Sequence, residues 1–183
     1  AERPVGLAEA KLHLKLDTTD EDVLVDALID AATEACRRFT GRELVSQTWR
    51  LMLDAAPDGG AIELPRPPLI AVTHVKTYDD ADAATTFAAG NYFVDTASVP
   101  GRVVPRTGAT WPTVGRAANG LEVEFVAGFG AQASAVPAPL RQGILVLVAY
   151  GYERREAQAE EPATLPAAVR ALWQPFRVAR LAR

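Results

Sequence analysis

The spacing of apolar side chains changes twice along this chain of 183 residues, and this change limits the folds that it can adopt. In residues 20–40 the apolar side chains recur with the spacing of a helix. In residues 47–127 apolar and polar side chains alternate in short runs, and in residues 137–155 the helical spacing returns. A sequence with the apolar spacing of a helix does not form a stable strand, and a sequence with the alternation of a strand does not form a stable helix. The pattern therefore predicts an α+β fold: long antiparallel-packed helices, an inserted block of short β-strands, and a C-terminal helical tail.

The helix expected over 20–40 has recognisable signals at both ends. Thr18, Thr19 and Asp20 can cap its start, and Gly41 follows as a C-cap. A single cysteine, Cys36, lies within it and is expected to act as a small, partly buried side chain. The apolar stripe of this helix is expected to consist of Leu24, Leu28, Ala31, Ala35 and Phe39, widened by Val23 and Ala27.

The segment 137–155 is apolar nearly all round, so we expect it to be the central buried helix. Pro137 and Pro139 lie at its start, where proline is tolerated. Shorter helices are expected over 6–14 and over 164–175, the latter broken at Pro175.

Prolines, glycines and aspartates divide the middle of the chain into short strands. Asp79–Asp82 reads as a hairpin tip, and residues 105–118, which include Trp111, read as a loop. Strict alternation over residues 70–78 would place Val72, His74 and Lys76 on one face. Strands are expected at 48–53, 61–64, 70–78, 92–95, 102–104 and 121–127.

Composition argues for a soluble globular protein rather than a membrane protein, because no apolar run approaches the roughly 20 residues that span a bilayer. The opening residues lack the basic and apolar regions of a signal peptide, so synthesis in a bacterial cytoplasm is expected. With one cysteine, an intramolecular disulfide and a cysteine-rich metal site are both excluded.

Charge is distributed unevenly along the chain, whose net charge is −4. No acidic residue follows Glu161, and the last segment carries Arg170, Arg177, Arg180 and Arg183. A basic tail on an acidic body indicates a partner for the tail. A solvated helix end whose arginines favour the helix dipole is the alternative. We expect a connector domain over 1–156, then a linker over 157–163 that leads into the basic tail, making 157–183 a separate segment.

No catalytic, cofactor or metal site is predicted, because the polar residues do not form the usual motifs. His13 and His74 lie in different elements, outside ligand-spaced motifs. The acidic residues at 79–82 are too few for a calcium loop. The glycines at 128–130 follow a strand, but they lack the spacing of a phosphate-binding loop.

Taken in order, several phrases of the sequence resemble the head–tail connector proteins of tailed phages and of gene transfer agents. The opening LAEAKLHLKLD, the TGR at 40–42 and the QTWRL at 47–51 are similar to this family. The phrases LPRPPL at 64–69, VAGFG at 126–130, VPAPLRQ at 136–142 and YGYERRE at 150–156 follow in the family's order. The resemblance covers about residues 5–156 and does not include the final segment.

This resemblance implies a structural adaptor of a particle neck, with no catalytic residues and no cofactor. Such adaptors form a ring, typically of about twelve copies, that joins the portal protein to the next neck (stopper or head-completion) protein. DNA passes through the channel without sequence-specific binding, and no membrane is involved. Two alternatives remain open: another neck or tail-completion protein, or a DNA-binding module that uses the basic tail and shows a steep salt dependence.

Two surfaces follow as hypotheses. Trp and Arg dominate binding hot spots, so we expect the tail to dock on the portal and become ordered there, and packing against its own domain is the alternative. Its candidate residues are Arg170, Leu172, Trp173, Phe176, Arg177, Arg180 and Leu181. A ring needs two different faces on each copy. Candidates for the ring interface are Asp26, Asp30, Glu34, Arg37, Arg38 and Trp111, and an ordinary solvated helix surface is the equal alternative for the helical ones.

Overall fold

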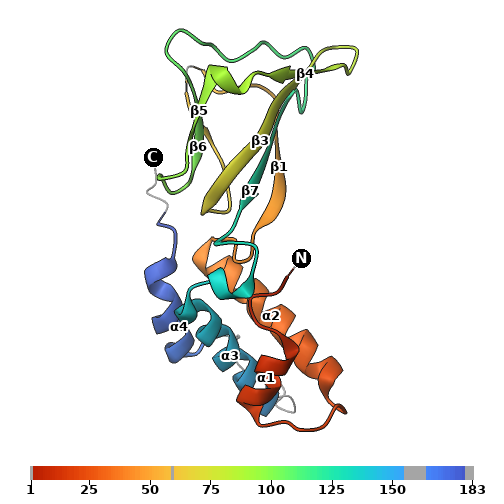
Figure 1. Ribbon diagram of the computed structural model, residues 1–183, viewed down its shortest axis with the longest axis vertical. Helices are drawn as coiled ribbons and strands as arrows, with labels where there is room; N and C mark the ends of the chain where they lie inside the picture. Colours follow the sequence, from red (N-terminus) through yellow and green to blue (C-terminus); the bar gives the residue numbers. More distant parts are fainter. Residues whose placement is uncertain (1, 59, 155–163, 180–183) are drawn as a thin grey trace. The chain divides into compact units, whose positions relative to one another are not determined.

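The computed structural model describes residues 2–58, 60–154 and 164–179. The chain forms two compact units, a helical unit (residues 1–45 and 130–183) and a strand unit (residues 46–129), coloured along the sequence in Figure 1. The α+β class is therefore confirmed. The linker expected over 157–163 lies outside the described residues, and the division between a domain at 1–156 and a tail stays a prediction.

The helical unit contains α1 (Leu7–Leu14), α2 (Asp22–Thr40), α3 (Ala138–Glu153) and α4 (Ala167–Trp173). As predicted, α3 is a central buried helix: it contacts the other three helices, and between Leu140 and Tyr152 only Gln142 is exposed. Pro137 is its N-cap. Near its other end, Gly151 faces Leu28 in the first half of α2, so α2 and α3 run antiparallel (Figure 1).

The ends and the buried face of α2 differ in part from expectation. The helix begins at Asp22 without a side-chain cap, because the turn before it is closed instead by the Asp22 N–H donating to the Thr19 carbonyl. At the other end Gly41 is the C-cap, with a φ of 71° that suits glycine. The fully buried line is shifted by one residue from the expected stripe: Val25, Ile29, Ala32 and Cys36 are buried, whereas Val23, Ala27 and Ala31 are exposed.

The strand unit contains two antiparallel sheets. The strands are β1 (Gln47–Leu53), β2 (Ile62–Glu63), β3 (Leu69–Tyr78), β4 (Ala84–Phe87), β5 (Tyr92–Asp95), β6 (Arg102–Pro105) and β7 (Leu121–Ala127). One sheet has the order β1-β7-β3-β4 and the other the order β2-β6-β5. Both sheets contribute to one core, in which Val75 and Phe125 of the first sheet meet Tyr92 and Val103 of the second.

Two features of the strand unit were not predicted. β4 was missed, because Ala84–Phe87 has little apolar character and forms a strand only by pairing with β3 across the hairpin at 79–82. Strict alternation along β3 was wrong, because the register against β7 shifts twice, between Leu69 and Ala71 and between Val72 and His74. These irregularities let Val72 and Val75 both reach the core, although they are three positions apart.

Candidate functional site

The charged face of α2 is partly engaged within the helical unit. Arg3, from the segment before α1, contacts Asp26 and donates to Asp30 at 3.1 Å. The hydrogen bond with Arg3 holds the pKa of Asp26 below its ordinary value. Asp30 and Glu34 keep more than half of their side-chain area exposed, and Arg38 is 82% exposed. The helical residues of the predicted ring interface that are most open to solvent are therefore Asp30, Glu34 and Arg38, whereas Asp26 keeps 41% of its side-chain area exposed.

Arg37 has a structural role that the helical pattern did not reveal. Its Nε lies 2.7 Å from a carboxylate oxygen of Glu43, whose side chain is completely buried. Glu43 lies just after α2, and the same carboxylate accepts from the Leu44 N–H at 3.2 Å. A buried carboxylate is costly without a cation, so Arg37 stabilises the turn that leads out of α2.

The tail residues that the structure describes pack against the rest of the helical unit. Trp173 is fully buried and its indole N–H donates to the Leu140 carbonyl at 3.2 Å. The ring lies so close to Gly143 that a Cβ there would be 2.1 Å from the indole nitrogen. Phe39 of α2 contacts the same ring, with centroids 6.1 Å apart. Trp173 thus holds α4 against α3.

The other predicted portal-binding residues lie on either side of Trp173 in the sequence. Arg170 and Arg177 are exposed, and Leu172 and Phe176 are half-buried. Arg180 and Leu181 lie outside the described residues. The binding role of the tail stays a prediction, and its exposed components are the two arginines.

Trp111 lies on the expected loop, between β6 and β7, and its side chain is partly buried in the strand unit. Its indole N–H donates to the Gly60 carbonyl at 2.9 Å, and its ring contacts Phe87 at 5.6 Å between centroids. A cavity of about 550 Å³ lies between the loops at residues 55–58 and 104–114. Asp58 and Arg106 are the titratable residues among those that line it. They do not form the convergent set that acid–base catalysis requires.

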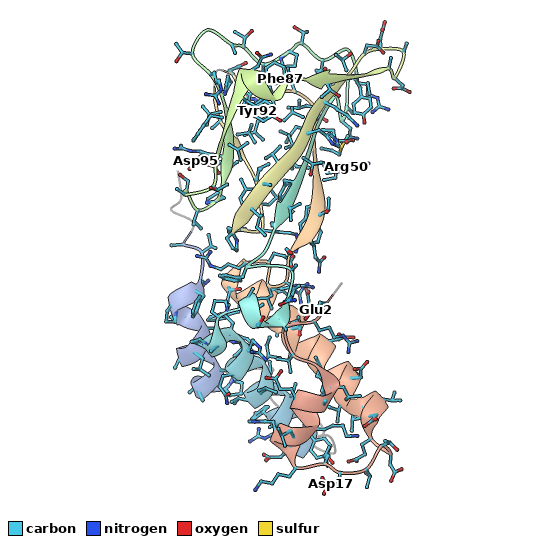
Figure 2. The ribbon with its side chains drawn as sticks, viewed as in Figure 1. Glu2, Asp17, Arg50, Phe87, Tyr92 and Asp95 are labelled. Atoms are coloured by element: carbon cyan, nitrogen blue, oxygen red, sulfur yellow. The ribbon has the colours of Figure 1, made fainter. Side chains whose placement is uncertain are left out.

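A polar cluster on the outer face of the four-stranded sheet was missed by sequence reasoning. Glu122 is only 3% exposed, and its carboxylate accepts from Tyr78 Oη at 2.8 Å and lies 2.9 Å from His74 Nε2. Arg50 lies 3.4 Å from Glu122 and 3.3 Å from Glu124. Figure 2 shows Arg50 on the side of this sheet opposite to Phe87 and Tyr92. Only the pairing of β1, β7 and β3 brings these residues together, and that register could not be read from the sequence.

The cluster has the donors of a metal site but also its own cation. Ligand atoms of His74, Glu122 and Glu124 lie within 4.8 Å of one another. The pKa of Glu122 lies below its ordinary value of 4.5. Burial by itself would raise this pKa, but the hydrogen bonds with His74 and Tyr78 and the charge of Arg50 lower it by more. Because Arg50 already supplies positive charge to both carboxylates, we assign no metal here.

No helix among the described residues is long and apolar enough to span a bilayer.

Comparison with known proteins places these features in a family. Residues 5–85 match the family model described as "Phage gp6-like head-tail connector protein". No curated protein sequence matches the chain. Among solved structures, "Neck of empty GTA particle computed with C6 symmetry" is similar with a TM-score of 0.81 and 31% identity, covering 98% of this chain and 92% of that chain.

Two further solved structures are similar to this chain over nearly its whole length. "Virion of native gene transfer agent (GTA) particle" gives a TM-score of 0.81 at 30% identity, covering 100% of this chain and 94% of that chain. "Neck of native GTA particle computed with C12 symmetry" gives a TM-score of 0.77 at 30% identity, covering 96% and 90%. The similarity extends over both units and is not confined to one of them. The chain therefore belongs to the family of phage gp6-like head–tail connector proteins.

Proposed function

We propose that this chain is a structural, non-enzymatic adaptor in the neck of a phage-like particle. In this role it forms a ring that joins the portal to the next neck protein and surrounds the DNA channel. The observation that carries the proposal is the 31% identity with a GTA neck protein over 98% of the chain.

The ring component rests on the symmetry named for the similar structures, which is C6 in one and C12 in another. Copies related by rotation meet through two different faces. On the helical unit, Asp30, Glu34 and Arg38 are the accessible candidates for one of these faces. Arg37 and Asp26 support the fold of their own copy through Glu43 and Arg3, and Trp111 supports its own strand unit.

The portal component rests on the C-terminal segment. Arg170 lies on α4 and Arg177 follows it, and both are exposed, so the two residues can contact a partner while α4 stays packed on α3. The guanidinium carbon of Arg177 lies 5.6 Å from the centroid of the Phe39 ring. We therefore assign portal contact to the exposed arginines and to the half-buried Leu172 and Phe176. Trp173 acts by holding α4 in place.

The first experiment mixes the purified protein with its cognate portal and determines the mass and symmetry of the complex by electron microscopy. A closed ring seated on the portal is expected. A well-folded protein that forms no complex with the portal would contradict the adaptor proposal.

A matched pair of variants tests the contact surface. Deleting α4 is unsuitable, because it would uncover the core around Val169 and Trp173. Reversing both charges in Arg170→Glu/Arg177→Glu leaves that core intact and should abolish portal binding. Arg106→Glu, at an exposed arginine of the strand unit, is the control for the added negative charge and should still bind.

A further inference from the structure

Among the residues that the structure describes, the four-stranded sheet ends in two strands that each pair on one side only, β1 and β4. We propose that these two edges join neighbouring copies, with β1 of one copy hydrogen-bonded to β4 of the next, so that the sheet continues around the ring. This inference rests on the proposed ring and names the surface that would close it.

Apart from the shortness of β4, which has four residues, the two edges lack most of the features by which proteins protect an exposed strand. Exposed edges are commonly shortened, bulged, or interrupted by proline and charge. β1 pairs with β7 over seven consecutive positions without a register shift, and Arg50 is its only charged residue. β4 has the sequence Ala-Thr-Thr-Phe, without charge or proline, and Ala84, Thr85 and Thr86 are exposed. Both edges are therefore suited to accept another strand.

The hydrogen-bond pattern identifies the backbone groups that are available on β4. Tyr78 donates its N–H to Gly120, and its carbonyl accepts from Gly115, so both of its backbone groups point away from β4. Tyr78 lies opposite Ala84. Because backbone groups alternate sides along a strand, those of Ala84 and Thr86 point to the free edge.

The same reasoning applies to β1. The Gly120 carbonyl points towards β3, so the backbone groups of the next residue, Leu121, point towards β1. Leu121 pairs with Leu53. The backbone groups of Leu53 therefore point towards β7. Because the direction alternates along β1, the backbone groups of Met52, Arg50 and Thr48 point to the free edge. Each copy thus offers a set of donors and acceptors at either end of one sheet.

Strand direction favours a rotational arrangement of copies. Every pair in this sheet is antiparallel, and the sheet has four strands, so β1 and β4 run in opposite directions. Copies related by rotation about a ring axis keep their strand directions. β4 of one copy would therefore meet β1 of the next as an antiparallel pair, and the alternation of the whole sheet continues without a break.

The second sheet does not offer an equivalent junction. It has three antiparallel strands, so its edge strands β2 and β5 run in the same direction. A rotational contact between them would be parallel, which is slightly less stable per residue. β2 also has only two residues. The four-stranded sheet is therefore the one that can extend from copy to copy.

The dimensions are compatible with a channel. Four strands at a spacing of about 4.8 Å give about 19 Å of circumference per copy. A closed ring of about twelve copies would then be about 70 Å across at the sheet backbone.

Disulfide trapping on the portal-bound ring tests the junction. In a Cys36→Ala background, Thr86→Cys is combined in turn with Thr48→Cys, Arg50→Cys or Met52→Cys. Opposed residues of an antiparallel pair have Cα atoms about 5.5 Å apart, which a disulfide can bridge. One double variant should give a ladder of cross-linked species beyond the dimer on a non-reducing gel, whereas the single variants should give none.

The outcomes separate the junction from the proposed function. A ring visible on the portal without a ladder from any pair would overturn the junction and leave the adaptor role intact. Dimers from a single-cysteine variant would show a two-fold contact and would also overturn it. A folded protein that forms neither ring nor portal complex would overturn the proposed function and the junction with it.

A second variant tests the same edge without cysteines. Thr86→Pro removes an N–H that points outward, so the β3–β4 pairing is retained and the thermal stability should change little. Ring formation should be lost in this variant and retained in Thr86→Ala. Normal rings from Thr86→Pro would overturn the proposed pairing.

Discussion

Replacement of Gly143 by alanine should destabilise the helical unit, although alanine is the better helix former. A Cβ at this position would lie 2.1 Å from Trp173 Nε1 and 2.8 Å from two ring carbons. Trp173 is fully buried and cannot move aside without losing contacts with α3 or Phe39. The substitution therefore sets a local gain in helix propensity against the docking of α4.

The structure sets limits on how much Gly143→Ala lowers the free energy of unfolding. If the ring shifts but stays docked, overpacking of this severity costs about 3 kcal/mol. If α4 detaches, the exposure of roughly 200 Å² of tryptophan surface costs about 5 kcal/mol, with about 1 kcal/mol more for the lost hydrogen bond to Leu140. Alanine returns about 1 kcal/mol through helix propensity. The net loss in the free energy of unfolding is therefore between about 2 and 5 kcal/mol.

The assay is urea unfolding followed by the helical circular-dichroism signal, with hydrogen exchange of α4 amides as a local probe. Gly151→Ala is the matched control on the same helix. There the new Cβ would meet only the end of the flexible Leu28 side chain, at 2.9 Å. This variant gains the same propensity and should be neutral or more stable by up to about 1 kcal/mol.

The two variants should thus differ in sign. Should Gly143→Ala be as stable as Gly151→Ala, the contact between α3 and Trp173 would not hold α4, and the reasoning would be refuted. Trp173→Ala provides a second check, because the cost of Gly143→Ala should largely disappear in that background.

Three further predictions concern charged and titratable groups. Hydrogen bonds from Ser98 and Arg102 lower the pKa of Asp95 from 3.8 to about 2. Its stabilising contribution is therefore present above pH 3.8 and lost as the pH falls towards 2, and Asp95→Asn should remove this part of the acid unfolding curve. Arg37→Ala should cost about 3 kcal/mol in urea unfolding, because its ion pair with the buried Glu43 carboxylate is lost, whereas Arg38→Ala should change stability by less than about 0.5 kcal/mol. Burial raises the pKa of Cys36 to about 12, so a thiol reagent should label the native protein far more slowly than the urea-unfolded chain.

The helices and most strands could be predicted because their signals are local. The prolines before α3, the glycine after α2 and the alternation of Leu121 to Ala127 each act within a few residues. Two long helical segments separated by short strands then restricted the chain to an α+β class. Even so, the buried line of α2 was placed one residue away, because two adjacent stripes have equally good helical spacing.

The features that could not be predicted from the sequence depend on which segments of the chain contact one another in the fold. The shift of the α2 stripe follows from the way that α1 and α3 cover that helix. β4 exists because β3 turns back beside it, and the cluster around Glu122 exists because three strands pair in one register. No local pattern encodes a register between segments tens of residues apart.

Composition, short-range periodicity and ordered motifs were enough to predict the order and type of most elements, the absence of an intramolecular disulfide and the family resemblance. The tertiary structure was needed to show that Trp173 packs against Gly143, that Arg37 forms an ion pair with Glu43, and that β1 and β4 are the edge strands of the four-stranded sheet. The physical reason is that burial, ion pairing and strand edges are properties of packed neighbours, and a neighbour in space is specified only when the whole chain has folded.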